Sequence, residues 1–360
     1  MARHERERNR CRERVEALAG ARLDPEQVRL EAIEALRRAV GFDRWCWPLT
    51  DPDSALSVSG IGELDFWPSL ALMVALEEHG DVTRKPRLVV GRRSSIALSA
   101  ATRGDLARSR RWRECLRPYG IGDELMTACR DRHGCWGSVE LMRDSDDPPF
   151  DEDDTRLLEG LAPALGTLLR RSLRQGWQAA PQDARPRPPG TMILNADLRP
   201  TSWTPAFRDW LRDLPSAGVD EAGESLPTAV YELGARALTP RDAATGLPNS
   251  VRIRTRTGRW SVIEGDLLEG GEDGRPAITV RAATAEEIFD VLCKAHGLTR
   301  RERQLAALVL AGLATRHLAE RLYISPYTVQ DHLKAIFAKT GVRSRRELVT
   351  HLTGRGAEAD

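Results

Sequence analysis

Four short amphipathic segments near the C-terminus constrain the fold more than any other feature of the chain. The first helix would begin at Thr299 with Glu302 and end at Gly312, and the second would begin near Thr315. The third would begin at Ser325 with Pro326 and end at Gly341, and the fourth would begin at Ser344 with Glu347. Ser, Thr and Glu at these spacings satisfy the free amides of a first helical turn, and glycine readily ends a helix. Helices joined by such short loops must pack together, because none can bury its apolar stripe alone.

The third of these segments has one apolar and one polar face. At 100° per residue, one face carries Val329, Leu333, Ile336 and Phe337, and the other carries Tyr327, Asp331, Lys334 and Ala338, with Gln330 at its flank. Residues 294–352 contain eleven Lys or Arg and four Asp or Glu, a net charge of +7, whereas the whole chain carries +1. A basic helical segment with one free face indicates a phosphate backbone as its partner.

The segment resembles the C-terminal DNA-binding domain of LuxR-type (GerE-like) transcriptional regulators. The resemblance rests on GLTRRE, AERLYIS, SPYTVQDHLKAIF and GVRSRREL. It implies an all-α helix-turn-helix domain of four helices at 297–354, whose third helix enters the major groove of DNA and whose fourth helps to form a dimer. Carried over by position, the residues that face base edges are Gln330, Asp331 and Lys334, and those near phosphates are Ser325, Tyr327, Thr328, Arg343 and Arg345.

The base-facing side chains suit different bases. Lys334 can donate to guanine and Gln330 can form two hydrogen bonds with adenine, each contact discriminating by about 1–3 kcal/mol. Asp331 can accept from cytosine N4, or it only orients Lys334 or Arg343. Tyr327 either contacts the DNA backbone or covers the start of the helix.

Residues 24–175 have the pattern of an α/β domain. Asp24-Pro25 begins a helix, FDRWCWPLT and CWGSVELM predict strands, and DEDDTRLLEGLAPALGTLLRRSL predicts a long helix with acids at its start and arginines at its end. The succession of strand, acidic turn and terminal helix resembles the C-terminal part of GAF sensor domains. We therefore expect a GAF-like domain here, preceded at 1–23 by a charged segment that is a solvated or frayed helix end.

A proline-rich stretch at 176–190 predicts a linker, because its prolines deny both helical and sheet hydrogen bonds. A strand, a turn and a short helix follow, and then antiparallel strands with the inward residues Val251, Ile253, Trp260, Val262, Ile278 and Val280. This pattern at 191–283 resembles a PAS domain. A capped helix at 284–296 connects it to the helical domain, and residues 355–360 form a tail.

Tryptophans are concentrated in the GAF-like half. Trp45, Trp47, Trp67 and Trp136 could line a ligand pocket, although tryptophans also commonly fill a core and cover its edges. The cluster of Cys129, His133 and Cys135 supplies three ligands where a structural zinc site needs four, so we expect no metal and reduced, buried thiols.

No residue pattern indicates catalysis. The motifs GxxxxGK[ST], GxSxG, HExxH and GxGxxG are absent, and nothing in the sequence is specific for haem or flavin. We therefore expect no cofactor and no enzymatic activity.

Taken together, these patterns predict a multidomain α+β protein that acts as a dimeric, sequence-specific transcriptional regulator. Its partners would be double-stranded DNA and a second copy, with RNA polymerase and a small-molecule ligand of the GAF-like and PAS-like domains as further candidates. The alternative is a non-enzymatic interaction or scaffold protein whose helical module binds another protein. The charged N-terminus and the lack of a run of about eighteen apolar residues predict a cytoplasmic chain without a membrane span.

Overall fold

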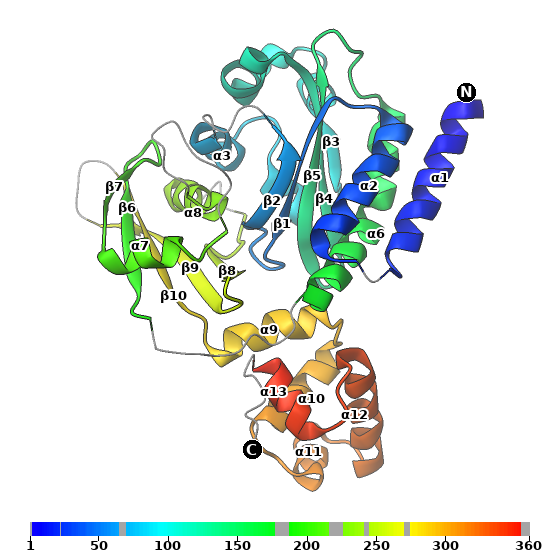
Figure 1. Ribbon diagram of the computed structural model, residues 1–360, viewed down its shortest axis with the longest axis vertical. Coiled ribbons are helices and arrows are strands. Elements are labelled where there is room, and N and C mark those ends of the chain that lie inside the picture. The colour runs from blue at the N-terminus through cyan, green and yellow to red at the C-terminus, as the bar shows by residue number, and fades with distance from the viewer. Residues whose placement is uncertain are drawn as a thin grey trace.

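The computed structural model describes residues 2–21, 23–64, 70–176, 187–215, 226–240, 245–269 and 274–353. Within them the chain forms two α/β domains side by side and a helical C-terminal domain below both (Figure 1). The predicted linker lies mostly outside the described residues, and Trp67 and the 355–360 tail lie entirely outside them. None of the described helices combines the length and the apolar character that crossing a membrane requires.

A five-stranded antiparallel sheet forms the centre of the first domain. Its strands are β1 (Arg44–Thr50), β2 (Ser57–Glu63), β3 (Ser95–Ala97), β4 (Ile121–Asp131) and β5 (Gly134–Asp144), in the order β2-β1-β5-β4-β3. One face is covered by α2 (Pro25–Val40) and α6 (Glu152–Gly176), and α1 (Ala2–Leu18) packs on the outer side of these two helices (Figure 1). The smaller helices are α3 (Leu70–His79), α4 (Lys85–Val90), α5 (Leu98–Thr102) and the short η2 (Leu106–Arg108), η3 (Trp112–Leu116) and η4 (Arg117–Tyr119).

The long helix α6 organises the core of this domain. Its first turn is acidic and Arg174 lies in its last turn, which matches the helix dipole. Its apolar stripe is buried on the sheet through Leu157, Leu158, Leu161, Leu165, Leu168, Leu169 and Leu173. The helix approaches β4 closely at Gly166, where a Cβ would lie 2.6 Å from the carbonyl carbon of Arg130. Any side chain at this position would push the helix off the sheet.

The N-terminal segment differs from the prediction. It forms α1, which buries Cys11, Val15 and Leu18 in the core shared with α2 and α6. Arg8 also pairs with the buried Asp154 of α6 at 2.8 Å. The three buried residues are spaced by four and three positions, which is the apolar period of a helix. Most charged side chains of α1 therefore line its outer face, and the segment is part of the domain rather than a frayed end.

The second domain contains another five-stranded antiparallel sheet. Its strands are β6 (Gly190–Leu194), β7 (Pro200–Trp203), β8 (Ser250–Arg254), β9 (Trp260–Leu268) and β10 (Arg275–Ala282), in the order β7-β6-β10-β9-β8. If the strands are numbered from 1 within each domain, both sheets have the strand order 2-1-5-4-3. The helices are α7 (Pro205–Leu211) and α8 (Thr228–Leu238), and α8 packs against α3 and β2 of the first domain as well as against β9 and β10. The two domains thus share a buried interface.

Two residues predicted to face the core of this domain, Trp260 and Val262, lie on the other face of β9, because Ile263 rather than Val262 pairs with Val251. Val251, Ile253, Ile278 and Val280 are in that core, but Trp260 packs against the core of the helical domain. Trp260 begins β9, and its carbonyl accepts a hydrogen bond from the amide of Ala283 at 3.0 Å. The start of the strand is therefore held beside the entry to the helical domain.

The helical domain has the predicted helices. They are α9 (Ala285–Ala295), α10 (Arg300–Leu310), α11 (Thr315–Leu322), α12 (Pro326–Thr340) and α13 (Arg345–Leu352). Thr299 and Glu302 form the predicted capping box, and Gly341 ends α12 in the left-handed conformation with φ 77°. The second predicted box is only half formed, because Glu347 accepts from the amide of Arg343 at 2.8 Å rather than from that of Ser344.

Candidate nucleic-acid interface

The polar face of α12 is open to solvent in the described structure. Val329, Leu333 and Ile336 anchor the helix in the domain core, which leaves Gln330, Asp331 and Lys334 exposed on the other side. Lys334 Nζ lies 3.7 Å from Asp331 Oδ1, and these side chains are 75% and 50% exposed. A pair so exposed is weak, so neither side chain is fixed by the other. The three side chains predicted to face bases therefore lie together and remain free to bind.

The first turn of α12 carries three of the residues predicted to lie near phosphates. The hydroxyl of Ser325 accepts from the amide of Thr328 at 3.1 Å, and the two side-chain oxygens are 2.9 Å apart. Tyr327 is 75% exposed, so it does not cover the start of the helix. The helix dipole makes such a first turn attractive to an anion.

The two predicted arginines have different surroundings. Arg343 is exposed in the loop before α13. Arg345 is half-buried and donates to the carbonyl of Leu313 at 3.2 Å and to the hydroxyl of Thr315 at 3.0 Å. Arg345 thus holds the loop between α10 and α11, a role that its position in the sequence did not indicate.

Some basic residues of the helical domain form ion pairs with acidic residues of the same chain. Lys339 pairs with the buried Glu302 at 2.6 Å, and Arg303 pairs with Asp290 at 3.5 Å. Lys294 pairs with Asp53 of the first domain, an acidic residue far away in the sequence. The excess charge that remains at the surface includes the exposed Arg321, Lys334 and Arg343, which flank or lie on α12.

A chain of hydrogen bonds connects the first domain to the C-terminal end of α12. Asp131 accepts from Nε1 of Trp136 at 3.0 Å and from Nε of Arg170 at 2.6 Å. Arg170 also donates to the carbonyl of Ala295, the last residue of α9, at 3.1 Å. One turn further along α6, Arg174 donates to the carbonyl of Lys339 at 3.2 Å. The β4–β5 hairpin, α6, α9 and α12 are thereby linked.

Three of the four tryptophans proposed for a ligand pocket fill the core instead. Trp45, Trp47 and Trp136 pack with the leucines of α6, and at most 3% of each is exposed. A cavity of about 40 Å³ lies on the opposite face of β1, where the intervening residues Cys46 and Pro48 point. Ligand pockets commonly measure about 300–1,000 Å³, so this cavity has room only for water.

The same cavity borders a cluster of buried charges that the sequence did not reveal. Lys85 Nζ lies 3.5 Å from Glu77, 3.3 Å from Glu140 and 3.8 Å from Glu232. Burial raises the pKa of Glu140 to about 7, with Lys85 opposing the shift. Glu232 belongs to α8 of the second domain, and it accepts from the amide and the hydroxyl of Ser57 at 2.6 and 2.8 Å. The cluster therefore joins the two α/β domains.

Two nearby thiols and a histidine do not come together as the sequence suggested they could. Cys129 belongs to the core beneath α6, whereas Cys135 belongs to an apolar cluster with Leu88 and Met126. Among the residues that the structure describes, no three His, Cys, Asp or Glu side chains are grouped so as to hold a metal ion.

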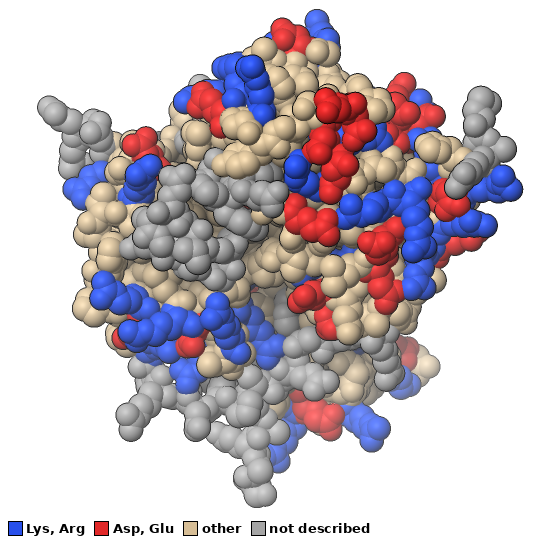
Figure 2. Space-filling model, turned by 45° about the horizontal axis from the view of Figure 1, so that its top comes forward, with Lys and Arg blue, Asp and Glu red and all other residues tan. Residues whose placement is uncertain are grey.

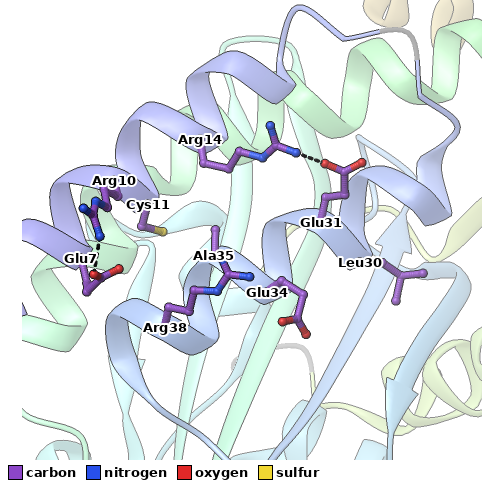
Figure 3. A pocket seen from close by; sticks show the side chains of 9 residues that line it. All are labelled: Glu7, Arg10, Cys11, Arg14, Leu30, Glu31, Glu34, Ala35 and Arg38. Atoms are coloured by element: carbon purple, nitrogen blue, oxygen red, sulfur yellow. Dashed lines mark hydrogen bonds and ion pairs between the residues drawn. The ribbon is translucent and has the colours of Figure 1, made fainter.

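A larger groove of about 740 Å³ runs between α1 and α2 (Figure 3). Cys11, Leu30 and Ala35 contribute its apolar surface, and the charged residues along it are Glu7, Arg10, Arg14, Glu31, Glu34 and Arg38. Both signs also occur together across this side of the molecule (Figure 2). With three acids and three arginines, the groove lacks the single-sign field that would attract a nucleic acid.

Comparison with known proteins identifies the helical domain. Residues 296–352 match the family model "Bacterial regulatory proteins, luxR family". An HTH-type transcriptional regulator of Mycobacterium bovis is 45% identical over 60 residues, which are 17% of this chain and 7% of that protein. The transcriptional regulatory protein FixJ of Rhizobium meliloti is 31% identical over 83 residues, 23% of this chain and 41% of FixJ.

The spore germination protein GerE of Bacillus subtilis is matched over most of its length. It is 36% identical over 59 residues, which are 16% of this chain and 80% of GerE. The matched family consists of regulatory proteins rather than enzymes. From the family match over the helical domain and the coverage of GerE, the chain belongs to the luxR family of bacterial regulatory proteins.

Proposed function

We propose that the protein is a DNA-binding transcriptional regulator whose α12 enters the major groove. The open polar face of α12 carries this proposal, because Gln330, Asp331 and Lys334 lie on it without being fixed by the fold. Membership of the luxR family and the basic excess of residues 294–352 support it. Tyr327, Thr328 and Arg343 would contact phosphates beside the groove.

Arg345 takes a revised role in this proposal. Its guanidinium is held by Leu313 and Thr315, so it would meet a phosphate only from a fixed position beside the loop between α10 and α11. A substitution at 345 would disturb the loop as well as DNA binding. Arg343 is therefore the better residue for testing phosphate contacts.

The two α/β domains would bias the DNA-bound state of the helical domain. We assign them as GAF-like and PAS-like, supported by their antiparallel sheets and by the long terminal helix of the first. The contacts of Arg170 with Ala295 and of Arg174 with Lys339 supply a physical connection to α12. Because the cavity beside Lys85 has room only for water, a small molecule could bind there only if the interface between the domains opened. A second copy and RNA polymerase are the protein partners that we propose.

The salt dependence of DNA binding tests the proposal. Fluorescence anisotropy of the full chain with a labelled random-sequence duplex, between 50 and 300 mM KCl, should give a log–log slope of about −2 to −4, since each neutralised phosphate contributes about −0.9. Arg343→Ala should make the slope less steep by about one. Absent or salt-independent binding would favour the scaffold alternative.

A further inference from the structure

The turn between α11 and α12 contains an aromatic side chain with no role in the fold. Tyr323 is 95% exposed, more than any other large hydrophobic residue among those described. Its backbone has φ 53° and ψ 47°, the left-handed conformation that favours glycine. An L-residue with a bulky side chain is disfavoured there by about 1–2 kcal/mol. The position therefore costs stability without burying the ring.

The turn holds this side chain in a defined place. The amide of Tyr323 donates to the carbonyl of Glu320 at 3.3 Å, and that of Ile324 donates to Ala319 at 3.0 Å. On either side, Leu322 is buried and Ile324 packs against the domain core. The backbone is thus anchored on both sides of the exposed ring.

The surroundings of Tyr323 indicate which partner it meets. It lies two residues before Ser325, the N-cap of α12, and Arg321 and Tyr327 beside it are also exposed. A phenol donates a hydrogen bond readily, and tyrosines are among the side chains that contact phosphates in protein–DNA interfaces. A strained, solvent-facing tyrosine in front of the major-groove helix is explained by such a contact.

We propose that Tyr323 donates a hydrogen bond from its phenol oxygen to a DNA phosphate beside the groove that α12 enters. The contact would position α12 on the duplex without selecting a base, since phosphates carry no direct sequence information. This inference rests on the proposed function and adds a contact that the sequence pattern did not assign.

Two substitutions at 323 separate the contact from the fold. Tyr323→Phe keeps the ring and removes the hydroxyl, and it should weaken binding to a labelled random duplex about three- to tenfold, as expected for one lost hydrogen bond. Tyr323→Gly should weaken binding at least as much, while the melting temperature stays the same or rises because the left-handed strain is relieved. Opposite changes in stability and affinity are not expected of a residue that only supports the fold.

Arg103→Gly is the matched control. Arg103 ends α5 in the first domain with φ 59° and ψ 39°, and it is also exposed. Its replacement relieves the same strain and should leave DNA affinity unchanged. If Tyr323→Phe binds DNA as tightly as the wild type, the phosphate contact is wrong, although the proposed function stands as long as the wild type binds. If the wild type shows no salt-sensitive binding, the proposed function itself fails.

Discussion

At the scale of single residues, the exposed carboxylate of Asp331 is the most informative feature of α12. It lies 3.7 Å from Lys334, but both side chains are at least half exposed, so the pair contributes little to stability. A carboxylate near DNA also repels phosphates. Its presence is explained if it accepts from a cytosine amino group, or if it keeps Lys334 oriented toward a guanine.

Asp331→Ala distinguishes these roles from a general effect of charge. We expect the variant to bind random duplexes several-fold more tightly, because one negative charge is lost, and to lose discrimination at one base pair worth about 1–3 kcal/mol. Competition binding with single-base variants of a selected site measures both effects. Glu320→Ala is the control, since Glu320 is exposed on α11 and pairs with Arg316 at 3.2 Å. Identical base preferences in the two variants would show that Asp331 recognises no base.

The tryptophans show the limit of residue-level prediction. Their apolar character predicts burial, and Trp45, Trp47 and Trp136 are indeed buried. Whether they line a cavity depends on which face of the sheet is packed by helices, and this depends on contacts between distant segments. The ion pairs of Lys85 with Glu140 and Glu232 were hidden for the same reason, because they join residues far apart in the chain.

At the scale of helices and strands, local signals predicted most of the structure. The N-caps Asp24, Thr299 and Ser325 act as expected because a cap depends on only a few consecutive residues. The helix α1 was missed as part of the core because its charges outnumber its apolar residues, although Cys11, Val15 and Leu18 repeat with helical spacing.

The contact between α9 and α13 depends on two neutral histidines. Nε2 of His296 lies 2.7 Å from Nε2 of His351, and Nδ1 of His296 lies 3.1 Å from the carbonyl of Lys339. Burial, followed by the proximity of His351, lowers the pKa of His296 to about 3, and burial also lowers the pKa of His351. The nearby Arg170 and Arg174 of α6 further disfavour a proton on His296.

These shifts predict a loss of stability in acid. The pKa values of both histidines are lower in the folded protein than in the unfolded chain, where a histidine has a pKa near 6.5. The stabilisation from the neutral pair is therefore present above pH 6.5 and is lost as the pH falls below it. The free energy of unfolding should decrease by on the order of 1 kcal/mol per pH unit between about pH 6 and pH 5 because of His296, and His351 should add to this decrease in the same direction.

Urea unfolding between pH 5 and pH 7.5 measures this dependence. His351→Gln should flatten it, whereas His317→Gln, at an exposed position on α11, should not. An equal pH dependence in both variants would contradict the role assigned to the histidine pair.

At the scale of the whole molecule, the domains differ in net charge, and ion pairs between opposite charges hold them together. The +7 of residues 294–352 faces a remainder of negative charge, and Lys294 uses part of this attraction to bind Asp53. Arg252 of the second domain pairs with Asp51 at 2.7 Å and with Asp290 of α9 at 3.4 Å. The three domains therefore meet at one ionic junction, which composition alone could not locate.

The helical domain was predictable because it depends on local patterns in consecutive residues. The packing of α8 between the two sheets was not, since it brings α3 and β2 against residues more than 150 positions away. In the function that we propose, what the α/β domains sense would depend on that interface, whereas the contacts to DNA would depend on the face of α12.

The central claim is that α12 selects a DNA sequence, and selection from random duplexes tests it most directly. The wild-type chain should enrich a common motif, which Lys334→Ala should relax at one base position. Arg343→Ala should retain the motif and only weaken binding, because a phosphate contact carries no sequence information. If the wild type enriches no motif, or if Lys334→Ala and Gln330→Ala both retain it unchanged, then α12 does not recognise DNA bases in the way described.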